Sequence, residues 1–194
     1  DEKYFPTINI EENCLIQIVS TNPVNPWKDI MQGMVQAILL ACKYVYIQTP
    51  YFLPTEPIAN ALQTAALSGV DVRLMLPERS DARIVHWGSR SYIEEMLRAG
   101  VKVYFYQKGF LHAKMIVSDD LFSTVGTTNI DFRSFEHNFE VNSFIYDSEL
   151  CEKLKGIFIL DQHDSKQIFL KNWQQRSLRV RIIESVVRLF SPLL

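Results

Sequence analysis

A histidine and a lysine two residues apart are the side chains of this sequence best suited to chemistry on an anion. His112 and Lys114 fall in the segment 111–117, where polar and apolar residues alternate and predict a strand. Successive side chains of a strand point to opposite faces, so these two share one face. An ammonium can neutralise a phosphate oxygen, and an imidazole can attack phosphorus or protonate a leaving oxygen. The pair therefore predicts a site for a phosphate-containing substrate.

The residues that follow supply other parts of such a site. Gly126-Thr127-Thr128-Asn129 is a donor-rich turn after a predicted strand, which suits contacts with phosphate. Glu140 opens the next predicted strand, and a carboxylate there can hold the tautomer of an attacking imidazole and stabilise the imidazolium. We expect Glu140 to orient His112. The residues expected to bind substrate are Lys114, Thr127, Thr128 and Asn129.

Each of these residues also has a purely structural interpretation. His112 could be a satisfied core histidine, but a buried lysine on the same face would be costly without an anionic partner. Glu140 could be a surface residue at the start of a strand. The predicted catalytic set consists of His112, Lys114, Glu140 and Asp119. Asp119 lies five residues after Lys114, and its place at a strand end favours a structural ion pair.

Other residues near the motif stay open between two roles. His137 and Asn138 fit a turn as well as they fit the lining of a site. Tyr51 follows a strand, where α/β sheets bind ligands, but aromatic core residues have the same appearance in a sequence. Arg133 could anchor an anionic head group. A local pair with Asp131 is the simpler interpretation, so Arg133 is left out of the catalytic set.

Strand and helix patterns alternate in the first half of the chain and then give way to strands alone. The strands are expected at 14–20, 43–48, 70–76 and 101–106, and the helices at 27–41, 58–67 and 89–99. Strand-like segments follow at 111–117, 122–125 and 139–146, and from residue 148 the pattern is helical to the end. We predict an α/β fold with a mixed, mostly parallel sheet between helices, and a site at one sheet edge facing a second domain.

Composition limits the class of protein. The chain has 194 residues, 47% hydrophobic and 22% charged, which suits one globular domain spanning 1–194. Its formal net charge of −2 provides no basic field, so no nucleic-acid partner is expected. The three cysteines have no metal spacing and predict reduced, buried thiols. No apolar run is as long as the about 20 residues that a membrane-spanning helix needs. The start at Asp1 suggests an excised piece of a longer protein.

The motif His112-x-Lys114-x4-Asp119, followed by Gly126-x-x-Asn129, resembles the signature of the phospholipase D superfamily. The resemblance implies that the histidine forms a phosphohistidine or acts as an acid, that the lysine and asparagine bind the phosphate, and that a later glutamate orients the histidine. A wider resemblance, to the second half of bacterial cardiolipin synthases, covers most of the chain. Its segments are Thr49-Pro50-Tyr51-Phe52 and residues 69–73, 90–92, 99–101, 109–114, 129–135 and 190–194.

This resemblance implies an activity and a set of partners. The family condenses two phosphatidylglycerol molecules to cardiolipin and glycerol, with no metal or organic cofactor. Its members carry two such motifs, and this chain has one, which implies that a missing N-terminal half or a second copy completes the site. His112 would then be the general acid and base. The resemblance also implies a bacterial membrane protein whose domain here is soluble and peripheral, on the cytoplasmic face.

Other functions remain open at this stage. A phospholipase D would differ only in using water as the acceptor. A nuclease of the same superfamily should show a basic groove. A non-catalytic half domain would serve only to complete its partner half, and it would give no turnover alone.

The segment 176–194 predicts an amphipathic tail helix. At about 100° per residue, its apolar residues share one broad arc, and most of its charged residues occupy the rest. A wide apolar face with basic residues opposite suits a helix lying in a bilayer interface. Packing on the domain or on the missing half is the alternative, and the sequence favours neither.

Overall fold

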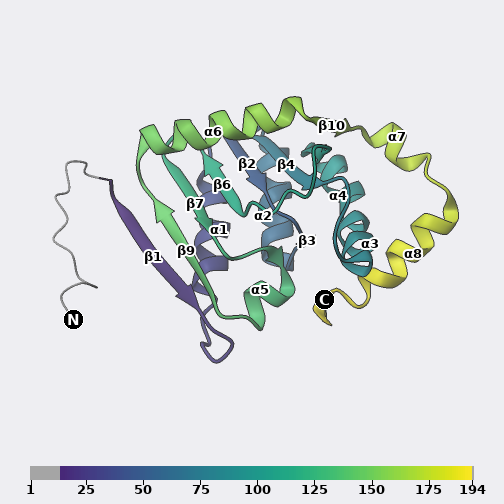
Figure 1. The fold of residues 1–194 in the computed structure, drawn as a ribbon, viewed down its shortest axis with the longest axis horizontal. Coiled ribbons are helices and arrows are strands. Elements are labelled where there is room, and N and C mark those ends of the chain that lie inside the picture. The colour runs from purple at the N-terminus through teal and green to yellow at the C-terminus, as the bar shows by residue number, and fades with distance from the viewer. Residues whose placement is uncertain (1–13, 194) are drawn as a thin grey trace.

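The computed structural model describes residues 14–193 of the protein (Figure 1). Its strands are β1 Ile16–Thr21, β2 Tyr44–Gln48, β3 Phe52–Leu53, β4 Asp71–Pro77, β5 Lys102–Tyr106, β6 Met115–Ser118, β7 Phe122–Gly126, β8 Ile130–Asp131, β9 Glu140–Ile145 and β10 Ser165–Ile168. Its helices are α1 Asp29–Leu40, α2 Glu56–Leu67, α3 Arg83–Ser91, α4 Ile93–Ala99, α5 Phe132–Glu136, α6 Ser148–His163, α7 Leu170–Gln174, α8 Leu178–Arg188 and the 3-10 helix η2 Ser191–Leu193. No helix within this range is long and apolar enough to cross a bilayer.

One mixed sheet holds the molecule together, in the strand order β1-β9-β7-β6-β2-β4-β5-β10. Two pairings in this sheet are parallel, β2 with β4 and β4 with β5, whereas the other five pairings are antiparallel. The predicted mixed sheet is confirmed, but the expectation that it is mostly parallel is wrong. Past β5 only β6 and β7 are neighbours joined by a short turn, residues 119–121, which makes that pair antiparallel. Other antiparallel pairs, such as β1 with β9 and β2 with β6, join strands that are far apart in the sequence.

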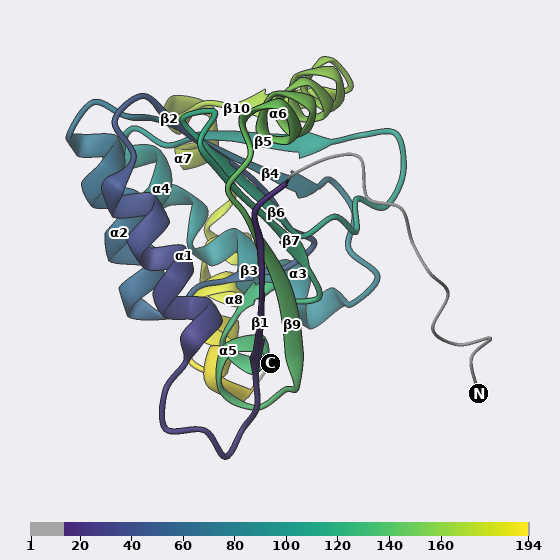
Figure 2. The same ribbon diagram turned by 90° about the vertical axis from the view of Figure 1, so that its left-hand side faces the viewer.

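Helices cover both faces of this sheet (Figures 1 and 2). On one face α1, α2 and α4 bury an apolar cluster that includes Ile30, Leu62 and Met96. On the other face α6 packs through Phe158, whose ring stacks on Tyr46 at 4.8 Å between centroids. The predicted α/β fold with a sheet between helices is therefore confirmed.

Some predicted element boundaries are wrong, because the elements concerned bury few of their side chains. The helix predicted at 89–99 is two helices, α3 and α4, which break at Tyr92. Only Gly88 and Ser89 of α3 are buried, so α3 has no apolar stripe that periodicity could reveal. β10 lies in the region predicted to be helical. It is an outer strand without a fully buried side chain, so it gives no strand signal.

Candidate active site

His112 and Lys114 lie in an extended segment that leads into β6, so the strand predicted at 111–117 begins only at Met115. Leu111 and Met115 are buried at either end of this segment and fix it to the domain, whereas His112 is exposed. The Lys114 Nζ lies 3.2 Å from His112 Nε2 and donates to the His112 carbonyl oxygen at 3.1 Å. The structure thus brings the predicted imidazole and ammonium together.

The surroundings of Lys114 prepare it for an anion. Burial lowers the pKa of its ammonium, while the carboxylates of Glu140 and Asp131 act in the opposite direction. Among the residues described, neither carboxylate forms a salt bridge with Lys114. A partly buried ammonium without a paired carboxylate favours the binding of a negatively charged group.

Glu140 is buried at the start of β9, beside the end of β7. The Thr127 hydroxyl donates to its Oε2, and the Asn138 Nδ2 donates to its Oε1 at 3.0 Å. Within the described part of the chain, no hydrogen bond joins Glu140 to His112. The predicted orienting contact is therefore not formed in this structure, and the carboxylate influences Lys114 instead. Asn138, which the sequence left open, belongs to the site.

The predicted donor-rich turn splits into exposed and buried residues. Thr127 is exposed and bridges Glu140 and the Val141 amide, which donates to the Thr127 hydroxyl at 3.0 Å. Thr128 is 1% exposed, and its hydroxyl donates to Asn142 Oδ1 at 2.7 Å. Thr128 therefore has a structural contact here, and its role as a substrate contact stays a prediction. Gly126 is required here, because a Cβ would lie 2.3 Å from Asn142 Oδ1.

Asn129 carries a polar atom that the fold leaves free. Its backbone amide donates to the Ser134 hydroxyl at 3.3 Å. Its Oδ1 is buried and has no hydrogen-bond partner among residues 14–193. Leaving a buried acceptor unpaired costs about 1–3 kcal/mol, so such an atom marks a place where a ligand can donate.

Asp119 lies at the far end of β6 from His112, in the turn before β7. Its carboxylate accepts from three backbone amides, those of Cys42, Lys43 and Tyr44, at 2.6, 2.9 and 2.8 Å. The catalytic assignment of Asp119 is therefore not supported by its position. The expected ion pair is also wrong, because its partners are backbone N–H groups of the loop before β2.

Asp131 and Tyr51 extend the site on the side of β3 and β8, which pair with each other. Asp131 caps α5 by accepting from the Ser134 amide at 2.6 Å, so it does not form the local pair with Arg133 that we expected. Burial raises the pKa of Asp131. The Tyr51 hydroxyl donates to Asp81 at 2.8 Å, and burial together with this bond raises the pKa of Tyr51 to about 12. The spacing Asp131-x-x-Ser134 is a capping signal that could have identified the role of Asp131.

The whole arrangement lies where β6 starts, β7 ends and β9 starts, which is one end of three adjacent strands. It faces outward. Phe110, 42% exposed, lies 5.4 Å from the His112 ring between centroids, and Phe139, next to Glu140, is 80% exposed. Two cavities of about 700 and 830 Å³ are lined by other residues. An open site of this kind can hold an anion on Lys114 but needs a further surface to enclose a substrate.

Known proteins match both the sequence and the fold. A family model described as "Cardiolipin synthase, PLD-like domain" matches residues 34–163. The chain is 45% identical over 191 residues to the major cardiolipin synthase ClsA of Bacillus subtilis, covering 98% of this chain and 40% of that protein. It is 48% identical over 189 residues to the cardiolipin synthase of Geobacillus thermodenitrificans, covering 97% of this chain and 38% of that protein. The chain therefore spans about two fifths of the length of the relatives it matches.

Solved structures share the fold at low sequence identity. Nuc, a phospholipase D family member from Salmonella typhimurium, superposes with a TM-score of 0.68 at 18% identity, covering 81% of this chain and 99% of that one. The phosphatidylserine synthase of Haemophilus influenzae superposes with a TM-score of 0.73 at 14% identity, covering 92% and 47%. Together with the family match over residues 34–163, these findings show that the chain belongs to the PLD-like domain family of cardiolipin synthases.

Proposed function

We propose that this domain takes part in phosphatidyl transfer, in which two phosphatidylglycerol molecules condense to cardiolipin and glycerol through a phosphohistidine. The observation that carries the proposal is the contact of 3.2 Å between Lys114 Nζ and His112 Nε2 at the open end of β6. The relatives at 42–48% identity that are named cardiolipin synthases support the choice of reaction.

His112 is the general acid and base of both steps in this proposal. In the first step a histidine outside this chain attacks phosphorus and the bond from phosphorus to the glycerol oxygen breaks. His112 donates a proton to that oxygen. In the second step the neutral imidazole takes the proton of the incoming hydroxyl as its oxygen attacks phosphorus and the bond from phosphorus to nitrogen breaks.

Lys114 holds the phosphate in both steps. A phosphate oxygen beside its ammonium replaces the His112 Nε2 as its partner, which frees that nitrogen for proton transfer. The unpaired Oδ1 of Asn129 accepts from a hydroxyl of the substrate. Thr127 and Asn138 hold Glu140 in place through hydrogen bonds, and from this position its carboxylate stabilises the imidazolium over a longer distance.

The site needs a second part, which we assign to the longer protein or to a second copy of the chain. His112 is the one histidine in residues 14–193 that lies beside an ammonium, and two-step transfer needs both a nucleophile and an acid. About three fifths of the length of the relatives lies outside the part that this chain covers. We place the working site at the membrane surface, because its substrate is a phospholipid.

The decisive experiment uses the full-length protein, with and without His112→Ala, on phosphatidylglycerol vesicles, with products identified by mass spectrometry. We expect cardiolipin and glycerol from the native protein and neither product from the variant. Release of phosphatidic acid would indicate hydrolysis instead of transfer. Full activity of the variant would make His112 a structural residue and would overturn the assignment of the site.

A further inference from the structure

The last long helix of the chain presents its apolar side to the outside. Six apolar side chains of α8 and the turn after it are between 44% and 78% exposed, whereas Val180 and Val187 are partly buried on the inner side of the helix. The six are Leu178, Ile182, Ile183, Val186, Leu189 and Phe190. A helix on the surface of a globular domain ordinarily buries such a stripe. The described residues therefore leave an apolar face of α8 bare.

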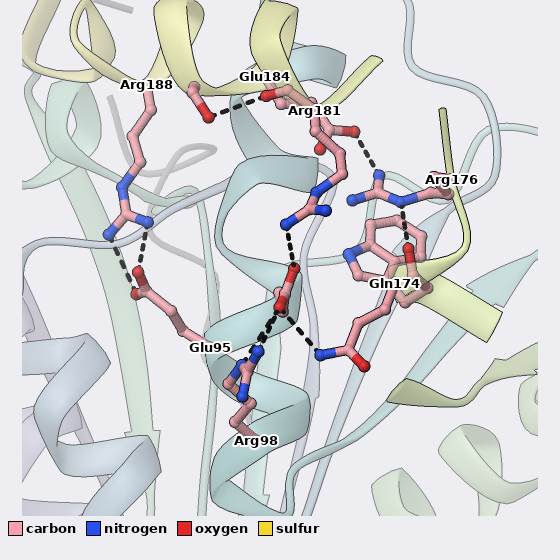
Figure 3. A network of polar contacts seen from close by, with 10 residues as sticks. Glu95, Arg98, Gln174, Arg176, Arg181, Glu184 and Arg188 are labelled. Carbon is pink, nitrogen blue, oxygen red and sulfur yellow. Dashed lines mark hydrogen bonds and ion pairs between the residues drawn. The ribbon is translucent and has the colours of Figure 1, made fainter. Parts of the chain in front are cut away.

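The polar side of α8 is turned toward the domain instead, and ion pairs hold it there (Figure 3). Arg188 forms a two-pronged pair with Glu95 of α4, at 2.5 and 3.0 Å. Arg181 lies 3.9 Å from Glu94, also on α4. Glu184, 3% exposed, accepts from Arg176 at 2.5 Å. These contacts fix the rotation of α8 about its axis.

Two of these arginines also pack on aromatic rings. The Arg188 guanidinium lies 4.2 Å from the ring centre of Tyr92, and that of Arg176 lies 3.5 Å from the ring centre of Trp173. Cation–π contacts and ion pairs together make the inward position of the polar side specific. The six exposed apolar residues thus face outward while the charged residues of the inner side have matched partners in the domain.

Charge indicates the partner that this face fits. Of the five basic residues in the segment 170–194, Arg176, Arg181 and Arg188 pair with glutamates, whereas Lys171 and Arg179 are exposed, and the one acidic residue of the segment, Glu184, is buried. Arg179 lies within the exposed apolar arc, where a long basic side chain can extend from apolar surroundings to a head group. An apolar helix face with basic residues around it complements an anionic lipid surface.

The position of α8 relative to the site agrees with such a partner. η2, which follows α8, packs against α5, and α5 begins directly after Asp131 of the candidate site. In both views the C-terminal end of the chain and α5 lie together at one end of the molecule (Figures 1 and 2). A surface in contact with α8 would therefore lie close to the end of the molecule that carries the site.

We propose that the outward apolar face of α8 docks on an anionic phospholipid bilayer, and that the arginine pairs with α4 hold the helix in this orientation. The choice of a phospholipid as partner rests on the proposed function, whereas the orientation of α8 does not. Leu178, Ile182, Val186 and Leu189 enter the acyl boundary, and the exposed basic residues contact the phosphates.

The test measures binding of the 194-residue chain to vesicles by co-sedimentation, without turnover. Vesicles of phosphatidylglycerol are compared with vesicles of phosphatidylcholine. We expect clear binding to the first and weak binding to the second. The double variant Ile182→Asp/Val186→Asp, at two exposed positions one turn apart, should reduce the bound fraction roughly tenfold or more. The matched control Ile157→Asp/Leu160→Asp changes two exposed residues of α6, which lies at the opposite end in Figure 1, and should bind like the native chain.

Several outcomes would overturn the proposal. They are the absence of binding by the native chain, equal binding to both kinds of vesicle, and unchanged binding by the α8 double variant while its thermal unfolding is native-like. If the native chain is a dimer that the α8 variant converts to monomers with unchanged vesicle binding, the face is a protein interface. His112→Ala should bind like the native chain, so failed docking and failed chemistry are distinguishable.

Discussion

At the residue scale, the site depends on how Lys114 is surrounded. Burial lowers the pKa of its ammonium, and the nearest acidic groups, Glu140 and Asp131, are held by other partners: Thr127, Asn138 and the Ser134 amide. The ammonium is left to contact His112, which is an imidazole and not an anion. Such an arrangement stabilises the folded protein poorly, but it stabilises a bound phosphate well.

Replacing Lys114 by methionine tests this balance between stability and function. We expect Lys114→Met to change the free energy of unfolding by no more than about 1 kcal/mol, in either direction, because a poorly paired charge is lost. Product formation should fall by about 10² to 10³, the range for loss of one group that stabilises a transition state. Urea denaturation and product analysis by mass spectrometry measure the two effects.

The control for Lys114 is Lys108→Met. Lys108 pairs with Asp164 at 2.9 Å on the surface, so its loss should leave both stability and product formation close to native. A Lys114→Met protein with native turnover would remove Lys114 from the phosphate site.

At the element scale, the turn between β6 and β7 joins the sheet to the loop before β2. Asp119 and Asp120 have positive φ values of 55° and 58°, and the Leu121 amide donates to the Ser118 carbonyl oxygen at 3.0 Å. Aspartate tolerates this backbone conformation better than most residues. The Asp119 carboxylate accepts hydrogen bonds from three backbone amides of the loop before β2 and the start of β2. Asp120 pairs with Lys155 of α6 at 3.0 Å, so the turn is tied to both β2 and α6.

We therefore expect Asp119→Ala to act on stability alone. Loss of a charged acceptor for three amides should lower the free energy of unfolding by about 2–3 kcal/mol. Asp119→Asn keeps one acceptor oxygen and the tolerance for positive φ, so its loss should be about half as large. Turnover per folded molecule should stay native in the asparagine variant. An Asp119→Asn protein that is stable but inactive would restore Asp119 to the catalytic set.

The elements that could be predicted from the sequence are those with a run or a stripe of buried apolar residues. β2, β4 and β5 are short runs of mostly buried residues, and α1 buries Ile30, Met34 and Ile38 at helical spacing, so each gave a clear signal. α3 and β10 bury too few side chains to be separated from their surroundings. The mostly antiparallel sheet was missed because pairing direction depends on where a chain returns, which local patterns do not encode.

The residues of the candidate site likewise fall into those whose contacts could be predicted from the sequence and those whose contacts could not. Types and spacing of residues sufficed to pair His112 with Lys114, because neighbours two apart in an extended chain share a face. They did not suffice for Asp119, Thr128 and Asp131, whose partners are distant in sequence or are backbone amides. The motif identifies candidate residues for the site, but their partners, and hence which of them can face a substrate, depend on the folded structure.

At the scale of the whole molecule, the site lacks an enclosing surface. His112 is exposed, and so are Phe110, whose ring lies beside the His112 ring, and Phe139, which precedes Glu140. Transition-state stabilisation by charge needs a site from which water is excluded, because the same charges interact weakly in water. We therefore propose that another part of the site brings both a surface and a nucleophile.

This incompleteness predicts how activity depends on chain length and concentration. The 194-residue chain alone should turn over phosphatidylglycerol at least roughly a thousandfold more slowly than the full-length protein, since it lacks one of two reacting groups. Turnover that increases with the square of chain concentration would instead mean that two copies complete the site. Native turnover that is constant per molecule on dilution would show that one copy suffices, and the requirement for a second part would be wrong.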